Sequence, residues 1–251
     1  MTSTCYLLKA MAQRSSIEWT ESTWNPVTGC DRISHGCDHC YAERMAFRLQ
    51  SMGSGRYKNA FDLTVHRDLL EVPLRWKEPR TIFVNSMSDL FHEKVPENVI
   101  RKIFATMNTA SWHTFQVLTK RPMELLRHAE TLTWTPNIWM GVTVESYRYV
   151  HRIEALRMVP AQVRFVSFEP LLSPIPMETS LEGIHWAIIG GESGPGARPM
   201  RKKWATDLRK LCRRHRTAFF FKQWGGVRKK TTGRLLDGRT YDEMPLIAAA
   251  L

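Results

Sequence analysis

The segment Thr81-Ile82-Phe83-Val84-Asn85-Ser86 opens a pattern that repeats along the chain and decides its predicted fold. The segment is short, carries branched and aromatic residues on both faces, and ends in polar residues. Such a run is typical of a parallel strand that is buried on both sides. Over residues 96–109, apolar side chains then recur every three or four positions, which predicts a helix.

The same alternation of strand and helix continues towards the C-terminus. Further apolar runs occupy residues 114–118, 137–142, 163–168, 185–190 and 218–221, and helical patterns occupy residues 122–129, 146–158 and 203–215. Alternating strands and helices form right-handed βαβ units in a single parallel sheet. With a first strand near Trp24, the chain has about seven strands. We therefore predict an α/β fold, a partial or complete (βα) TIM-like barrel of about six to eight parallel strands.

Three regions are expected along the chain. Residues 1–16 form a flexible N-terminal extension, residues 17–225 form the barrel, and residues 226–251 form a tail that wraps the barrel or frays. Residues 56–80 have little periodicity beyond a short helix at residues 68–76. This connection is a candidate cover over a site, although a surface excursion without a role fits it equally well.

Composition narrows the class of protein and its partners. The 251 residues are 43% hydrophobic, which is typical of a globular chain. The net charge of +12, from 36 Lys and Arg against 24 Asp and Glu, favours a polyanionic partner, with nucleic acid first. The sequence has no signal-peptide core and no apolar stretch approaching the ~20 residues of a membrane helix, so no membrane association is expected.

The five cysteines indicate a reducing compartment. An odd number cannot all pair, and three of them crowd one short segment, so a cytoplasmic location with free thiols is the simplest expectation. Cys212 is expected to be a small buried residue on a helix, and Cys5 belongs to the N-terminal extension.

The segment Cys30-Asp31-Arg32-Ile33-Ser34-His35-Gly36-Cys37-Asp38-His39-Cys40-Tyr41 holds the other three cysteines, spaced Cys-x6-Cys-x2-Cys. Thiols gathered in this way indicate a metal site. A structural zinc site uses four protein ligands, whereas an iron-sulfur cluster or a catalytic metal can leave one position open for a ligand. Asn25-Pro26 and Gly29 predict the turn that presents Cys30, and residues 41–52 have the spacing of a helix.

Polar residues follow every predicted strand. In parallel α/β folds the carboxyl ends of the strands meet at one edge, where the reactive groups gather. Each of these residues alone could cap a helix or form a turn, but together they predict a site. Three carboxylates, Glu145, Glu169 and Glu192, could fix an amine and ribose hydroxyls. Gly190 and Gly191 allow close backbone approach, although they lack the spacing of a dinucleotide-binding fingerprint.

Several motifs carry a resemblance to a known family. They are Trp24-Asn25-Pro26-Val27-Thr28-Gly29-Cys30, Asn85-Ser86-Met87-Ser88-Asp89-Leu90-Phe91-His92, Leu118-Thr119-Lys120-Arg121-Pro122, Gly190-Gly191-Glu192-Ser193-Gly194 and Phe221-Lys222-Gln223-Trp224-Gly225. Together with the predicted barrel, they resemble a phage- and prophage-associated family of three-cysteine, radical-SAM-like proteins within the radical S-adenosylmethionine superfamily. The likeness runs from about residue 17 to residue 225. The superfamily's usual first cysteine gap is three residues, whereas here it is six.

The resemblance implies a barrel of the radical SAM type and two cofactors. Cys30, Cys37 and Cys40 would bind three irons of a [4Fe-4S] cluster, and the fourth iron would chelate S-adenosyl-L-methionine. An electron donor such as flavodoxin or ferredoxin would reduce the cluster, and a 5'-deoxyadenosyl radical would take hydrogen from the substrate. The implied cofactor-binding residues are Tyr41, Ser86, Asp89, Thr143, Glu145, Ser167, Glu169, Gly190, Gly191 and Glu192.

A nucleic-acid substrate is the hypothesis that the basic charge favours. Cations cluster on the predicted connections, and tryptophans between them could stack on bases. The cations are Arg75, Lys77, Arg80, Lys120, Arg121, Arg198, Arg201, Lys202, Lys203, Lys222, Arg228, Lys229 and Lys230, and the tryptophans are Trp76, Trp139, Trp204 and Trp224. The predicted substrate-binding residues are Lys120, Arg121, Lys222 and Trp224.

By distant likeness to spore photoproduct lyase, the reaction would be repair or modification of a DNA base. DNA is favoured over RNA as the substrate, and a protein partner could take part in its recognition.

Two other classes of function compete with the enzyme. One is a non-catalytic zinc- or cluster-bearing nucleic-acid-binding protein, with His35 or His39 as a fourth ligand. The other is a hydrolase that uses Ser86 or Ser88 with His92 and Asp89, but the chain has no nucleophile-elbow sequence around either serine. The resemblance favours the radical enzyme over both.

Overall fold

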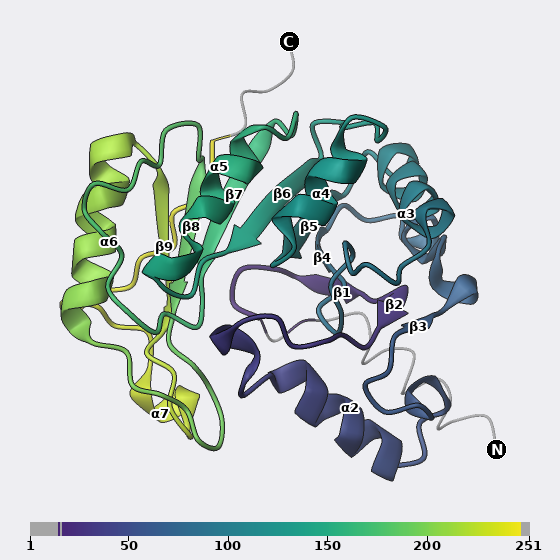
Figure 1. Cartoon of the computed structure of the whole chain (residues 1–251), viewed down its shortest axis with the longest axis horizontal. Helices are drawn as coiled ribbons and strands as arrows, with labels where there is room; N and C mark the ends of the chain where they lie inside the picture. The colour runs from purple at the N-terminus through teal and green to yellow at the C-terminus, as the bar shows by residue number, and fades with distance from the viewer. Residues whose placement is uncertain (1–14, 16, 247–251) are drawn as a thin grey trace.

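A computed structural model of the chain describes residues 15 and 17–246. Its centre is a sheet of seven parallel strands, and their order across the sheet follows their order along the chain (Figure 1). The strands are β1 (Ser22–Trp24), β4 (Thr81–Val84), β5 (Thr114–Thr119), β6 (Ile138–Thr143), β7 (Val163–Phe168), β8 (Trp186–Gly190) and β9 (Ala218–Gln223). The predictions on residues 1–14 and 16, including Cys5, and on residues 247–251 lie outside the described residues.

The sheet curls into a half-barrel, because no ladder joins β1 to β9 within the described residues. The predicted (βα) barrel is therefore confirmed as a partial barrel of seven strands. Four helices cross over between consecutive strands: α3 (Glu97–Thr109), α4 (Pro122–Ala129), α5 (His151–Arg157) and α6 (Lys202–His215). Chain order across a parallel sheet requires all crossovers to lie on the same face, as in a barrel rather than a doubly wound sheet.

Local departures from the predicted elements have simple physical causes. A second, antiparallel sheet pairs β2 (Val27–Thr28) with β3 (Thr64–Val65), and two residues are too few to give a periodic signal. The helical pattern of residues 146–158 divides into a 3-10 turn (Tyr147–Tyr149) and α5. The predicted short helix in residues 68–76 is likewise two 3-10 turns, Arg67–Leu69 and Val72–Arg75.

The two faces of the sheet bury different side chains. The face under the helices packs mainly aliphatic residues against α3 to α6, and Cys212 is buried there as predicted. On the other face, a concave aromatic cluster fills the half-barrel: Trp19, Phe83, Trp139, Phe165, Trp186 and Phe220. Trp139 and Trp76 are only 3% and 8% exposed, so the hypothesis that they stack on bases is wrong.

The segment after β9 lies beside the sheet. A short helix, α7 (Lys229–Thr232), is followed by residues that run antiparallel along the free edge of β9, where Phe220 pairs with Asp242. The Phe221 amide donates to the Tyr241 carbonyl at 2.9 Å, and the Trp186 indole donates to the Glu243 carbonyl at 2.8 Å. Across the described part of the chain, every helix is too short or too polar to span a bilayer.

Candidate functional site

The cysteine loop connects β2 to α2 (Tyr41–Ser51) at the carboxyl ends of the parallel strands. Two residues fix its start. The Asn25 side-chain oxygen accepts hydrogen bonds from the Ser86 hydroxyl and the Met87 amide, both at 3.1 Å, which ties β1 to the end of β4. Gly29 has a φ of +86°, and a Cβ there would lie 2.3 Å from the Asp62 carbonyl oxygen. Only glycine fits this turn, which presents Cys30 as the sequence predicts.

The three thiols of the loop are free and partly exposed. Cys37 follows a 3-10 turn, and Cys40 stands at the N-cap of α2. Among residues 15 and 17–246, no three His, Cys, Asp or Glu side chains are gathered closely enough to hold a metal ion. Burial and the nearby Asp89 carboxylate raise the pKa of the Cys30 thiol to about 11, against the opposing effect of Arg121.

Arg121 lies at the end of β5 and reaches into the cysteine loop. Its Nη1 lies 3.4 Å from the Cys30 sulfur, its Nη2 donates to the Asp31 carbonyl at 3.3 Å, and its Nε pairs with Glu93 at 2.9 Å. The side chain is almost fully buried. In this arrangement the predicted substrate-binding Arg121 holds the cysteine loop.

Asp89 positions Arg121 by fixing the end of β5. Its carboxylate accepts hydrogen bonds from the Thr119 hydroxyl at 2.7 Å, the Lys120 amide at 2.9 Å and the Phe91 amide at 3.1 Å. All of these donors belong to the protein, and the Asp89 side chain is buried. Asp89 therefore ties the loop after β4 to β5 beneath the cysteine loop.

Glu145, just beyond β6, forms a buried ion pair with Arg152 of α5. Arg152 Nη1 donates to Glu145 Oε2 at 2.9 Å and to the Thr143 carbonyl at 2.8 Å, and neither side chain is exposed. The other carboxylate oxygen, Glu145 Oε1, is buried without a partner, as is the Thr143 hydroxyl. A Cβ on Gly36 would lie 3.0 Å from Glu145 Oε1, so the cysteine loop packs directly on this carboxylate.

Glu192, just beyond β8, is the hub of a second set of contacts to the cysteine loop. It accepts hydrogen bonds from the Arg198 backbone amide at 2.8 Å and the Arg198 side chain at 2.9 Å, and lies 2.9 Å from His39 Nδ1. Arg198 also donates to the His35 carbonyl at 2.7 Å and to Asp38 at 3.1 Å. The loop after β8 therefore clamps residues 35–39.

The Glu192 network predicts a pH-dependent contribution to stability. Burial alone raises the pKa of the Glu192 carboxyl, but hydrogen bonds from Arg198 and His39 outweigh it and lower the pKa from 4.5 to about 2. A lowered pKa gives stability that is present above about pH 4.5 and is lost as the pH falls towards 2. We expect Glu192→Gln to lower the free energy of unfolding by about 2 kcal/mol at pH 6.

Urea unfolding of the wild type and Glu192→Gln at pH 6 and pH 3 measures this difference. The gap between the two proteins should narrow markedly at pH 3. Glu154→Gln, which removes a carboxylate from an exposed ion pair, should cost little at either pH. A gap for Glu192→Gln that stays constant between the two pH values would contradict the assignment.

The mouth of the half-barrel, where the strands end, contains an ion pair between Glu169 and Lys222. Lys222 Nζ lies 2.7 and 2.9 Å from the two Glu169 oxygens, and both side chains are partly exposed. A Cβ on Gly190 would lie 3.0 Å from the Glu169 carboxyl carbon, and one on Gly191 would overlap the Trp224 carbonyl oxygen. These glycines therefore let the ends of β7, β8 and β9 approach closely.

Tyr41, the first residue of α2, crosses to the end of β4, where its hydroxyl donates to the Ser86 carbonyl. The ring is half-exposed, but desolvation of the hydroxyl and the charges of Cys40 and Glu169 raise its pKa. Tyr41 thus lies across the mouth between the cysteine loop and the Glu169–Lys222 pair.

The remaining predicted site residues differ in their surroundings. Ser167 is buried at the end of β7, and its carbonyl accepts the Val144 amide. Lys120 is partly exposed and forms no side-chain ion pair within the described chain. The Trp224 ring packs on Phe221 and donates to the Leu235 carbonyl at 2.8 Å, so its polar atom is already bonded.

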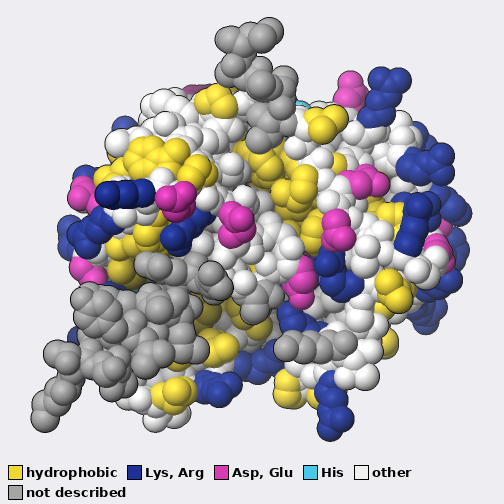
Figure 2. Space-filling model, turned by 180° about the vertical axis from the view of Figure 1, so that it is seen from behind, with side chains coloured by type: hydrophobic (Ala, Val, Ile, Leu, Met, Phe, Trp, Pro, Cys, Tyr) yellow, Lys and Arg dark blue, Asp and Glu magenta, His cyan; other side chains and the backbone are white. Residues whose placement is uncertain are grey.

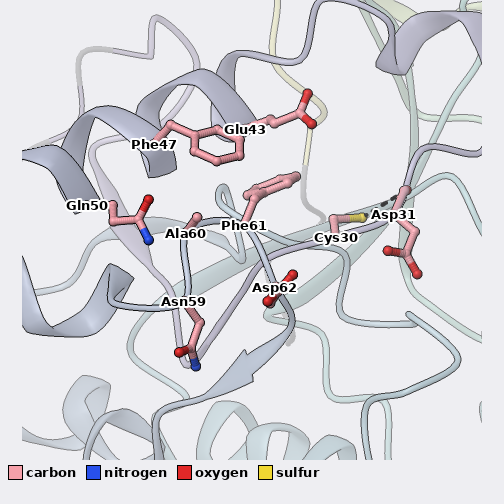
Figure 3. A pocket seen from close by; sticks show the side chains of 9 residues that line it. All are labelled: Cys30, Asp31, Glu43, Phe47, Gln50, Asn59, Ala60, Phe61 and Asp62. Atoms are coloured by element: carbon pink, nitrogen blue, oxygen red, sulfur yellow. Dashed lines mark hydrogen bonds between the residues drawn. The ribbon is translucent and has the colours of Figure 1, made fainter.

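A pocket of about 480 Å³ opens beside Cys30 (Figure 3). Cys30 and Asp31 form one side, Glu43, Phe47 and Gln50 of α2 form another, and residues 59–62 close it. The Cys30 amide donates to the Phe61 carbonyl at 3.2 Å. Part of the long connection at residues 56–80 therefore lies against the cysteine loop.

The residues of the hydrolase alternative do not form a catalytic triad. The Ser86 hydroxyl donates to Asn25, and the Ser88 hydroxyl donates to the Gly29 carbonyl at 2.6 Å. His92 Nε2 contacts Asp31, and Asp89 is bonded to Thr119. Neither serine contacts the histidine, so this alternative is wrong.

Sequence reasoning missed several residues that hold the site together. Arg152 occupies the buried face of α5 with Ile153 and Leu156, and a cation at an apolar position was an available signal of a buried partner. The partnership of His39 and Arg198 with Glu192 spans up to 153 positions of sequence. No local pattern in the chain predicts such a contact.

The fold and the site define a class: partial (βα) barrels that carry a three-cysteine loop over the carboxyl ends of their strands, clamped by side chains from β5, β6 and β8. The chain belongs to the family described as "Protein of unknown function (DUF5131)", which matches residues 14–245. No curated protein and no solved structure matches the chain.

Proposed function

We propose that this protein is a radical S-adenosylmethionine enzyme that acts on a nucleic acid. The observation that carries the proposal is the place of Cys30, Cys37 and Cys40. Three free, partly exposed thiols lie on one loop over the mouth of a partial parallel barrel, where the polar strand ends meet. The resemblance of the sequence to radical-SAM-like proteins gives this arrangement a specific chemistry.

The donor set fits a [4Fe-4S] cluster in its chemistry, since the three thiols are free of disulfides and reach solvent. Their mutual positions in the described structure are not those of a closed metal site. Cys30, Cys37 and Cys40 would hold the cluster. When bound, it would supply the electron for cleavage of S-adenosyl-L-methionine and so for hydrogen abstraction from a substrate.

The chain's own residues support such a site in three ways. The Arg121 guanidinium faces the Cys30 sulfur and would balance the negative charge of a thiolate. Glu192 and Arg198 hold the backbone of the cysteine loop in place. Glu169 and Lys222 present a carboxylate and an ammonium side by side, which suits a ligand that carries both an amino and a carboxyl group.

The nucleic-acid part of the proposal rests on charge. The net charge of +12 favours a polyanion, and Lys120 at the mouth is free of an ion pair among the described residues. A DNA base that is repaired or modified is the substrate we favour. Flavodoxin or ferredoxin would supply the electron, and a partner protein could assist in recognition.

Anaerobic reconstitution of the purified chain with iron and sulfide tests the proposal. We expect about four irons and four sulfides per chain, a brown colour, and 5'-deoxyadenosine on addition of reductant and S-adenosyl-L-methionine. Formation of 5'-deoxyadenosine should rise when UV-irradiated DNA is added. Alanine at Cys30, Cys37 or Cys40 should abolish both iron binding and 5'-deoxyadenosine formation.

Cys212→Ala is the matched control, because Cys212 is buried on α6 and points into the core. It should retain the cluster and its activity. A colourless protein with one zinc per chain would overturn the radical mechanism and favour the zinc-bearing nucleic-acid-binding alternative.

A further inference from the structure

Helix α6 carries a large share of the positive charge of the chain. Residues 202–216 contain seven Lys and Arg and one acidic residue, a net +6, which is half of the net charge of +12. The helix covers the sheet at the β9 edge (Figure 1), and Lys and Arg gather along that edge of the molecule (Figure 2). Its buried face is apolar, with Ala205, Leu208, Leu211 and Cys212, so the cations are confined to the outer face.

The cations on the outer face are only partly neutralised. Among the described residues, Asp207 pairs with Lys203 at 2.7 Å and with Lys210 at 3.8 Å. Asp237 pairs with Lys202 at 2.7 Å and lies 3.7 Å from Arg209. No carboxylate of the described chain lies within ion-pair distance of Arg213, Arg214 or Arg216, and all three are exposed.

A pocket of about 270 Å³ lies between this face and the segment that runs along β9. Arg209, Arg213 and Arg239 line it, and the guanidiniums of Arg209 and Arg239 lie 4.6 and 4.4 Å from the centre of the Tyr241 ring. Glu243 is the carboxylate of the pocket, and its Oε2 accepts the Phe219 amide at 2.9 Å, which turns it towards β9. Three guanidiniums against one engaged carboxylate leave the pocket positive.

We propose that this pocket and the outer face of α6 bind the phosphate backbone of a nucleic-acid strand. Guanidiniums bind phosphate oxygens in pairs, and the helix repeats its cations about every 5.4 Å turn. The Tyr241 ring is buried beneath the arginines, so this face offers phosphate contacts rather than base stacking. Binding here is therefore independent of sequence and sensitive to salt.

This surface is distinct from the mouth, because the pocket lies towards the C-terminal part of α6 and the start of β9. The inference goes beyond the proposed function, since binding at α6 requires neither the cluster nor S-adenosyl-L-methionine. If the proposed function holds, α6 would hold the strand that flanks the base at the mouth. Loss of one activity without the other separates the two proposals.

Fluorescence anisotropy of a labelled 20-nucleotide single strand, titrated with the purified chain, tests the inference. The variant Lys210→Gln/Arg213→Gln removes two exposed cations from α6. The matched control, Arg101→Gln/Lys102→Gln, removes two exposed cations from α3, near the other edge of the sheet. Circular dichroism and thermal melting establish that each variant is folded.

We expect the α6 variant to bind the strand about tenfold or more weakly than the wild type, while the α3 control stays within about twofold. The slope of log K against log salt should fall in magnitude by about 2 for the α6 variant, or roughly one per lost phosphate contact. Arg213→Lys alone should retain most of the binding, because it retains the charge.

Equal losses in the α6 and α3 variants would overturn the inference, as would an α6 variant that binds like the wild type or a wild type that does not bind the strand. Calorimetry with inorganic pyrophosphate distinguishes a small phosphorylated ligand from a strand. Micromolar pyrophosphate binding that Arg213→Gln abolishes, with unchanged binding of the strand, would assign the pocket to a small ligand and overturn the nucleic-acid source.

Discussion

Replacing Arg152 by methionine is expected to lower the free energy of unfolding by about 3–5 kcal/mol. Arg152 and Glu145 are both buried, and the guanidinium donates to the carboxylate at 2.9 Å and to the Thr143 carbonyl at 2.8 Å. Methionine fills similar space but leaves a buried carboxylate without its partner. The loss should be measurable by urea unfolding at pH 7, where the wild type and variant are compared directly.

A double variant separates the loss of a partner from the net contribution of the pair. Glu145→Leu/Arg152→Met removes both charges, so it should recover most of the stability that Arg152→Met loses. Because Gly36 packs on Glu145, the double variant should also alter the cysteine loop and reduce iron uptake on reconstitution. A double variant as unstable as Arg152→Met would show that the cost has another source.

Trp186→Ala is expected to cost about 3–5 kcal/mol, a large part of the stability of a typical domain. Trp186 is fully buried, and its ring centre lies 5.7–6.1 Å from those of Trp19, Trp139, Phe165 and Phe220. Alanine leaves a cavity in the concave aromatic cluster. It also removes the indole donor of the Glu243 carbonyl.

Trp112→Ala is the matched control for Trp186→Ala. Trp112 is 41% exposed and also donates to a backbone carbonyl, that of Trp76, at 2.8 Å. Its removal should cost only about 1 kcal/mol, because little packing is lost. Thermal and urea unfolding of both variants would measure the difference. Similar losses at the two positions would show that the concave cluster contributes little to stability.

Much of the sheet could be predicted from the sequence because buried parallel strands leave a strong local signal. The strand at Val163–Phe168 and the helix at Pro122–Ala129 have the predicted bounds. Their apolar runs and the proline at the first helical turn are local features. In contrast, β2 and β3 are two residues each and form only because Gly29 packs against residues 61 and 62, a contact between segments far apart in sequence.

The candidate site could be located from the sequence but its internal contacts could not. The polar residues that follow β5, β6 and β8 do lie around the cysteine loop, as the shared edge of a parallel sheet requires. Their partners depend on side-chain directions that only the folded chain fixes. Arg121 faces Cys30, and Lys222 faces Glu169, although the sequence gives both the character of free surface cations.

The order of the strands has a consequence for how the chain folds during synthesis. Each strand of the large sheet is hydrogen-bonded to the strand that precedes it along that sheet, so every ladder can form as soon as its second strand leaves the ribosome. The concave aromatic cluster, however, joins Trp19 at one end of the barrel sequence to Phe220 at the other. A nascent chain that lacks β9 would hold paired strands around an incomplete core, and full cooperativity would come only with the last strand.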